Sequence, residues 1–215
     1  MKTTMKTIKF LIVIALFIGF ISCDSDDDNG PTLVQVESKK IEDLFAPQQG
    51  GHGQPVSGEF TKFDFASGKI TTSDTDWDIA FRGTSVIING GVSSGTTDEP
   101  NRTGEGAAYI ARGTMATITE VTTSSFVQDA TDGFAIPTGS GNGWYNYTGR
   151  PDHLILPIAG RILVIKTRDG KYAKVEVLSY YKGAPAEPNV ITGTDESKYY
   201  TFNYVYQPND GVTTF

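Results

Sequence analysis

The sequence predicts an all-β fold of antiparallel strands with one or two short helices. Apolar residues recur mostly at every second position, and the runs are separated by turns containing glycine, which supplies 24 of the 215 residues. Few segments show the 3.6-residue period of a long helix. A chain of this length can bury one sizeable core, so we expect one folded domain over residues 32–215.

The first 22 residues predict a lipoprotein signal peptide. Lysines precede the apolar run 10–21, which is too short to span a bilayer comfortably. Ser22-Cys23 completes a bacterial lipobox, in which the cysteine thiol is acylated and becomes the first residue of the mature protein. An ordinary signal peptide followed by an incidental cysteine is the alternative.

Residues 23–31 predict an acidic, disordered tether, because the run contains too few apolar side chains to fold. One interpretation is a solvated spacer. The other is a surface signal, since the run resembles the acidic tract that directs lipoproteins of Bacteroidota to the outer leaflet. The second interpretation predicts an outer-membrane protein, anchored by lipid on Cys23 and exposed at the cell surface.

The folded part begins with a predicted short helix over Ser38–Phe45. Ser38 would be its N-cap, Ile41 and Leu44 would share one side, and Pro47 would stop it. A glycine-rich loop then leads into the strands.

Four short strands follow. Residues 60–65 and 69–72 form a hairpin across a turn containing glycine, and residues 76–82 and 85–88 are two further strands. Strict alternation predicts that one face of the third strand carries Trp77, Ile79 and Phe81.

Two irregular stretches interrupt the strands. Residues 92–106 are rich in Ser, Thr, Gly and Pro and predict a surface loop. The glycines of residues 133–143 do not open a helix after a strand, so they predict no dinucleotide site. Residues 107–111, between the two stretches, predict a strand or a buried turn.

The segment 161–181 predicts the hairpin around which the chain is organised. Residues 162–165 are apolar and β-branched, and Asp169-Gly170 offers the two residues of a type I′ turn. On the return strand we expect a buried face of Ala173, Val175 and Val177 and a solvent face of Lys174 and Glu176. A last strand, 199–206, places its aromatic residues on one face.

Charge and composition argue against several classes of function. The formal charge is −7, and removal of the leader, with three lysines and no acids, would make it −10, so no nucleic-acid partner is expected. Asp74, Asp76 and Asp78 have the spacing of a calcium loop but lack its Gly and its closing Glu. The two histidines stand in no catalytic or zinc-binding motif, so we expect no enzyme.

Five motifs run through most of the mature chain: Trp77–Phe81, Asn89–Gly91, Gly143-Trp144, the hairpin Ile162–Tyr181 and Tyr200–Tyr204. In this order, and together with the lipobox, they resemble the HmuY family of haem-binding lipoproteins of Bacteroidota. The resemblance implies a hand-shaped β protein that holds a haem between loops, passes it to an outer-membrane TonB-dependent receptor for iron acquisition and catalyses no reaction.

The resemblance also implies two axial donors to the haem iron, for which His and Met are suited. One family donor comes from a hairpin before the Gly-Trp motif, but no His or Met lies between Phe126 and Trp144. The other lies a few residues after the motif, where this chain has Gly149, which has no donor. The remaining candidates are His153, Met115, Tyr145 and Tyr147 as axial ligands and Trp144 as a wall of the pocket.

Each candidate also has an ordinary structural interpretation. His153 and His52 can be exposed loop residues, Met115 can fill core space, and the aromatic cluster can be packing. A second function on the same scaffold is a non-haem surface module, which would stack a glycan, a peptide or another planar ligand on Trp144, Tyr145 and Tyr147.

Overall fold

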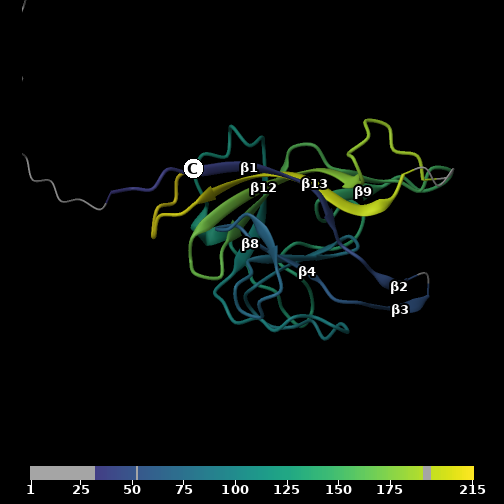
Figure 1. Ribbon diagram of the computed structural model, residues 1–215, viewed down its shortest axis with the longest axis horizontal. Coiled ribbons are helices and arrows are strands. Elements are labelled where there is room, and N and C mark those ends of the chain that lie inside the picture. The colour runs from purple at the N-terminus through teal and green to yellow at the C-terminus, as the bar shows by residue number, and fades with distance from the viewer. Residues whose placement is uncertain (1–31, 52, 191–194) are drawn as a thin grey trace, which may run out of the picture. The chain divides into compact units, whose positions relative to one another are not determined.

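Two antiparallel sheets form the framework of the protein, which we describe from a computed structural model at residues 32–51, 53–190 and 195–215. The larger sheet has the strand order β1-β13-β12-β11-β8, and the smaller has the order β5-β4-β6-β7. Figure 1 labels β1, β8, β12 and β13 of the larger sheet and β4 of the smaller. The larger sheet comprises β1 (Glu37–Phe45), β8 (Ala107–Arg112), β11 (Arg161–Lys166), β12 (Tyr172–Tyr181) and β13 (Ser197–Gln207). The smaller comprises β4 (Thr61–Asp64), β5 (Lys69–Thr71), β6 (Ile79–Arg82) and β7 (Ser85–Ile88). Two separate hairpins pair β2 (Gln49–Gly51) with β3 (Gln54–Ser57) and β9 (Tyr145–Tyr147) with β10 (Ile155–Pro157). The predicted all-β class is confirmed.

The core lies between the two sheets and is largely aromatic. The Phe63 and Phe81 rings of the smaller sheet lie 5.5 and 5.7 Å from the Phe202 ring of β13. Tyr200, Phe202 and Tyr204 are each 0% exposed, as the alternation of the last strand predicts. Replacing one such ring by alanine typically costs about 3–5 kcal/mol of stability, so these rings hold the sheets together.

The helix predicted at Ser38–Phe45 is wrong, because this segment is strand β1. The pairing with β13 shifts register between Ile41 and Leu44, and Asp43 adopts a φ of 53° there. The irregularity lets Ile41 and Leu44 pack against the same core at a three-residue spacing. A bulge in a strand therefore produced the periodicity of a helix.

The central hairpin is confirmed, but its predicted type I′ turn is not. Lys166 pairs with Tyr172, Thr167 N donates to the Lys171 carbonyl, and only Gly170 of the turn has a positive φ, of 86°. The connection is therefore a longer turn closed by a bulge, as three-residue hairpin loops usually are. The extra length places Arg168 beside the smaller sheet.

The predicted solvent face of β12 is covered near Lys174, which is 5% exposed. Its Nζ donates to the carbonyls of Met115 and Ile118 at 2.7 Å each and lies 4.7 Å from the centre of the Phe215 ring. Sequence alternation shows which residues share a face, but it does not show that a distant segment covers that face.

The strand predicted at 76–82 is shorter, since β6 begins at Ile79. Trp77 consequently lies off the face shared by Ile79 and Phe81 and packs with Phe60, Ala80 and Ile87 in a separate buried cluster. The predicted strand at 107–111 is present as β8.

The loop 92–106 has a buried ionic centre. Arg102 pairs with Glu99 at 2.8 Å and with Asp129 at 2.9 Å, and the three side chains are at most 2% exposed. Asp129 also accepts the backbone N–H groups of Ile88 and Ala135. Such a fully paired group fixes a segment that has no regular secondary structure.

Residues 33–215 form one compact unit. Its described residues contain one helical segment, a 3₁₀ turn at Thr123–Ser125, and no helix long and apolar enough to cross a membrane. The predictions for the signal peptide, the tether, Cys23 and His52 concern residues outside the described ranges.

Candidate functional site

The β9–β10 hairpin brings two of the candidate ligands together at its tip. Tyr147 ends β9 and pairs with Ile155 of β10, and the tip between them contains His153. Thr148 N donates to the Leu154 carbonyl and His153 N to the Gly149 carbonyl, at 2.9 and 2.8 Å. These bonds close the tip and fix the backbone of His153, which has a φ of 53°.

The Tyr147 hydroxyl and His153 Nδ1 form a hydrogen bond, with the ring centres 5.8 Å apart. Both side chains are exposed, Tyr147 at 44%. No hydrogen bond to His153 Nε2 is formed by the described residues. A histidine held through one ring nitrogen presents the other to a metal in a fixed direction.

Trp144 and Tyr145, in contrast, belong to the core. They are 2% and 8% exposed, and Trp144 Nε1 donates to the Thr84 carbonyl at 2.9 Å. The Trp144 ring lies 5.1 Å from the Tyr200 ring. Burial raises the pKa of the Tyr200 and Tyr180 phenols, so these neighbouring tyrosines remain protonated and are poor anionic ligands.

Met115 lies on the opposite face of the larger sheet. It packs with Ile162 and Val164 of β11, whereas Leu163 and Ile165 face the core that contains Trp144. Because successive side chains of a strand point to opposite faces, the sheet separates Met115 from the core side, on which Leu154 packs beside His153. The two soft donors of the described residues are therefore not brought together.

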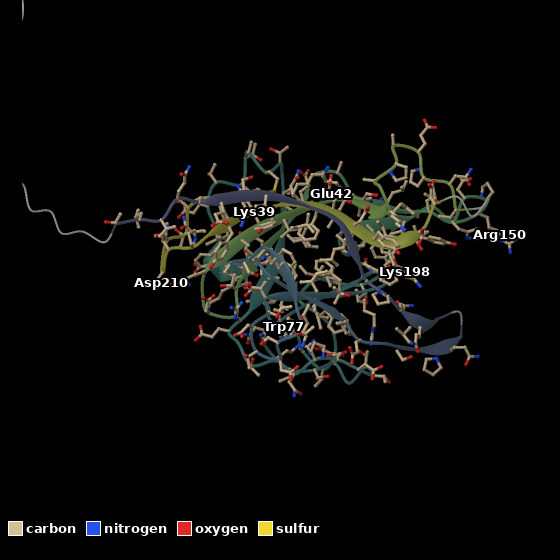
Figure 2. The ribbon with its side chains drawn as sticks, in the orientation of Figure 1. Lys39, Glu42, Trp77, Arg150, Lys198 and Asp210 are labelled. Carbon is tan, nitrogen blue, oxygen red and sulfur yellow. The ribbon has the colours of Figure 1, made fainter. Side chains whose placement is uncertain are left out.

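A pocket of about 220 Å³ adjoins the tip. It lies between the residues that flank His153, Asp152 and Leu154, and the segment 187–190, which contributes Glu187 and Val190. Arg150 is exposed in the same tip, and its side chain points away from the sheets (Figure 2). No sequence motif indicates this pocket, because its two walls lie far apart in the chain.

A larger pocket of about 470 Å³ lies elsewhere, along β4, β5 and residues 98–100. Its wall mixes apolar and polar side chains, including Phe60, Lys62, Ile70, Thr71, Asp74 and Asp98. Lys62 Nζ pairs with Asp74 at 3.1 Å, so this carboxylate is already engaged. The part of the chain that the structure describes contains no group of three or more acidic, His or Cys side chains placed to hold a metal ion.

Comparison with known proteins identifies one family. The family model described as HmuY protein matches residues 57–204. No curated protein matches the chain at a significant level.

Three solved structures are similar at low identity. A predicted lipoprotein of Bacteroides fragilis is 13% identical, with 82% of this chain and 94% of that chain covered and a TM-score of 0.45. The apo HmuY analog of Tannerella forsythia is 15% identical, with 83% and 100% covered and a TM-score of 0.43. A predicted HmuY-like heme binding protein of Bacteroides vulgatus is 15% identical, with 81% and 93% covered and a TM-score of 0.41.

Proposed function

The chain belongs to the HmuY family, and we propose from this membership that it is a surface-exposed lipoprotein that binds haem for iron acquisition, without catalysis. The observation that carries the haem assignment is the exposed His153 at the tip of the β9–β10 hairpin, held through Nδ1 by Tyr147. Membership of the family indicates haem as the ligand, and His153 is the donor that we propose for its iron.

The tip residues would offer one nitrogen donor to a bound haem. Haem contributes an iron that accepts an imidazole nitrogen and a large apolar ring that needs apolar contacts. His153 Nε2 would be the donor, Tyr147 would position the imidazole, and Leu154 and Val190 would offer apolar surface in a pocket that Asp152 and Glu187 also line. Tyr145 and Met115 would reach the same iron only after the core or the sheet had opened, so we assign neither of them as a ligand.

The proposed location rests on the N-terminal sequence. Acylation of Cys23 would anchor the protein in the outer membrane, and the acidic run after it would direct the folded unit to the cell surface. A haem carrier in this position would deliver its cargo to an outer-membrane TonB-dependent receptor.

Titration of the purified protein with haemin tests the proposal. A Soret shift is expected for the wild type, a strong loss of affinity for His153→Ala, and no change for Met115→Leu. Absence of a Soret shift in both the oxidised and the reduced form would refute haem binding. Equal affinity of His153→Ala and the wild type would refute the assigned ligand.

The 470 Å³ pocket supports a second candidate, a non-haem binding module, because its volume lies within the range of about 300–1,000 Å³ typical of small-molecule sites. Its hydroxyl and carboxylate groups favour a hydroxylated ligand such as a glycan. Ile70 is 56% exposed on its wall, so Ile70→Trp would fill the pocket without disturbing the core. Loss of glycan binding in Ile70→Trp, with binding retained in Val92→Trp at an exposed position outside the pocket, would support this candidate.

A further inference from the structure

A buried arginine ties together the two walls of the 470 Å³ pocket. Arg82 is 3% exposed, and its Nη1 donates to the Gly58 carbonyl at 3.0 Å and to the Thr97 carbonyl. Its Nη2 donates to Thr96 Oγ1 at 3.1 Å. Gly58 directly precedes one wall, and Thr97 directly precedes the other wall, residues 98–100. The shape of the pocket is therefore largely preformed, as in most small-molecule sites.

Arg82 is also a buried cation whose hydrogen bonds, within the described residues, go to neutral oxygens. Its guanidinium carbon lies 4.2 Å from the centre of the Phe60 ring, which lines the pocket. Burial lowers the pKa of the guanidinium, and the charges of Glu99 and Asp98 oppose this shift. Since a buried charge is costly unless other charges balance it, these acidic side chains of the wall help to stabilise Arg82.

Acidic side chains outnumber basic ones around the pocket. Four carboxylates line it, against the single ammonium of Lys62. Two of the carboxylates are paired, Asp74 with Lys62 at 3.1 Å and Glu99 with Arg102 at 2.8 Å. Because Lys62 is engaged in this way, the described residues of the wall offer no free cation to an anionic ligand.

The other two carboxylates of the pocket, those of Glu59 and Asp98, have acceptor oxygens that are not used. Glu59 is exposed and makes no hydrogen bond or ion pair with the described residues. Asp98 is exposed as well, and its Oδ2 accepts the Gly58 N–H at 2.8 Å. Because Gly58 directly precedes Glu59, this bond brings the two carboxylates to the same end of the pocket. An ammonium group of a ligand would form charge-assisted hydrogen bonds there, which are stronger than neutral ones.

The rest of the pocket suits a sugar ring. Ile70 and Pro100 offer apolar surface, and Thr71 and Thr72 offer hydroxyl groups. A sugar ring presents both C–H groups and hydroxyl groups, so it matches this mixture of a mainly apolar wall with a few polar groups.

We propose that this pocket binds an amino sugar, with the ammonium group at Glu59 and Asp98 and the ring against Ile70. The inference rests on the second candidate function, a glycan-binding module, and names the class of glycan. It predicts that glycans with free amines bind more tightly than neutral or acidic glycans.

Calorimetric titration of the purified protein with two matched probes tests the proposal. The probes are the tetrasaccharide of β-1,4-linked glucosamine and its fully N-acetylated form, which differ in the charge of their amino groups. At pH 6 the charged probe should bind about fivefold more tightly, as expected for one partly exposed ion pair. Its affinity should fall as sodium chloride is added, whereas the affinity of the acetylated probe should not change.

Three variants locate the binding site. Glu59→Gln should lower the preference for the charged probe. Glu187→Gln removes the same charge at an exposed position outside this pocket and should keep the preference. Ile70→Trp fills the pocket and should lose both probes.

The possible failures are distinguishable. Equal affinity of the wild type for the two probes would overturn the role of the amine and leave the glycan-binding candidate standing. No binding of either probe would overturn the amino-sugar assignment, whereas the glycan-binding candidate itself fails if no neutral glycan shows binding that Ile70→Trp removes. A preference for the charged probe that persists in Ile70→Trp would overturn the assignment to this pocket, because the probe then binds elsewhere on the acidic surface.

Discussion

Asp78 Oδ1 accepts hydrogen bonds of 3.1 Å from both the backbone nitrogen and Nη1 of Arg168, a residue 90 positions later in the chain. The same Nη1 donates to Asp64 Oδ1 at 2.7 Å. Asp78 is 1% exposed, so its carboxylate depends on these partners and on the Phe65 N–H. The turn of the central hairpin is thereby fastened to the smaller sheet.

Arg168→Met should destabilise the fold strongly. It leaves Asp78 buried without its cation, a change that typically costs about 3 kcal/mol. Urea unfolding measures the loss. Lys171→Met, at the end of the same turn, is the matched control and should cost less than about 1 kcal/mol, because its pair with Asp169 is partly exposed to solvent. Equal losses in the two variants would contradict this role of Arg168.

Glu99 should make the free energy of unfolding depend on pH. Burial alone would raise the pKa of its carboxyl, but hydrogen bonds from Ser94 and Thr96 and the charge of Arg102 lower the pKa from 4.5 to about 2. Between these values the folded state binds fewer protons than the unfolded state, so stability falls as the pH falls through this window. The stability difference between wild type and Glu99→Gln should therefore shrink below pH 4.5 in urea unfolding. A difference that is constant with pH would contradict the prediction, and Glu42→Gln serves as the exposed control.

Asp43→Val should weaken β1. A β-branched residue is strained at a φ of 53°, and the substitution also removes the hydrogen bond from Gly183 N to the Asp43 carboxylate. We expect a loss of about 2 kcal/mol in thermal or urea unfolding. Glu42→Val, at the neighbouring exposed position, should change stability by less than about 0.5 kcal/mol. An unchanged stability in Asp43→Val would show that the backbone at the bulge can relax.

Tyr147→Phe should weaken haemin binding without affecting folding. Loss of the hydroxyl frees the imidazole of His153, and removal of such an orienting group typically costs about tenfold in metal affinity. Stability should change by less than about 0.5 kcal/mol, because the side chain is exposed. Tyr172→Phe, on the far face of the larger sheet, is the matched control. Unchanged affinity in Tyr147→Phe would remove this tyrosine from the site.

Trp144→Phe should lower the stability of the fold and leave haemin binding nearly unchanged, which is the reverse of the result expected for Tyr147→Phe. It removes the hydrogen bond to the Thr84 carbonyl and leaves space in the core, which together cost about 2–3 kcal/mol. The haemin dissociation constant should stay within about twofold, because the ring is buried. Weaker haemin binding at unchanged stability would instead place Trp144 in the wall of a binding pocket.

The sequence predicted the strands whose alternation is local. The aromatic face of β13 and the apolar face of β12 follow from period-two patterns and were predicted correctly. The same reasoning failed at Ile41 and Leu44, because a bulge changes the period, and at Lys174, because the segment that covers it is about 60 residues away. A local sequence pattern does not show which distant segment will cover the face of a strand.

Less of the candidate site could be predicted. The sequence offered His153 and Tyr147 separately, and their hydrogen bond depends on the register of β9 against β10. The buried group of Glu99, Arg102 and Asp129 gave no signal either, because charged residues in a polar loop are ordinarily exposed. Buried ion pairs of this kind can be recognised only once the fold is known.

β1 is an outermost strand of the larger sheet, with β13 as its sole neighbour there. The unpaired edge of a long flat strand can pair with a strand of another molecule. The register shift between Ile41 and Leu44 interrupts the regular pairing of β1 with β13, and an irregularity of this kind typically bends a strand. The irregularity that gives residues 38–45 a helix-like periodicity would thus also make this edge of the sheet a poorer template for pairing between molecules.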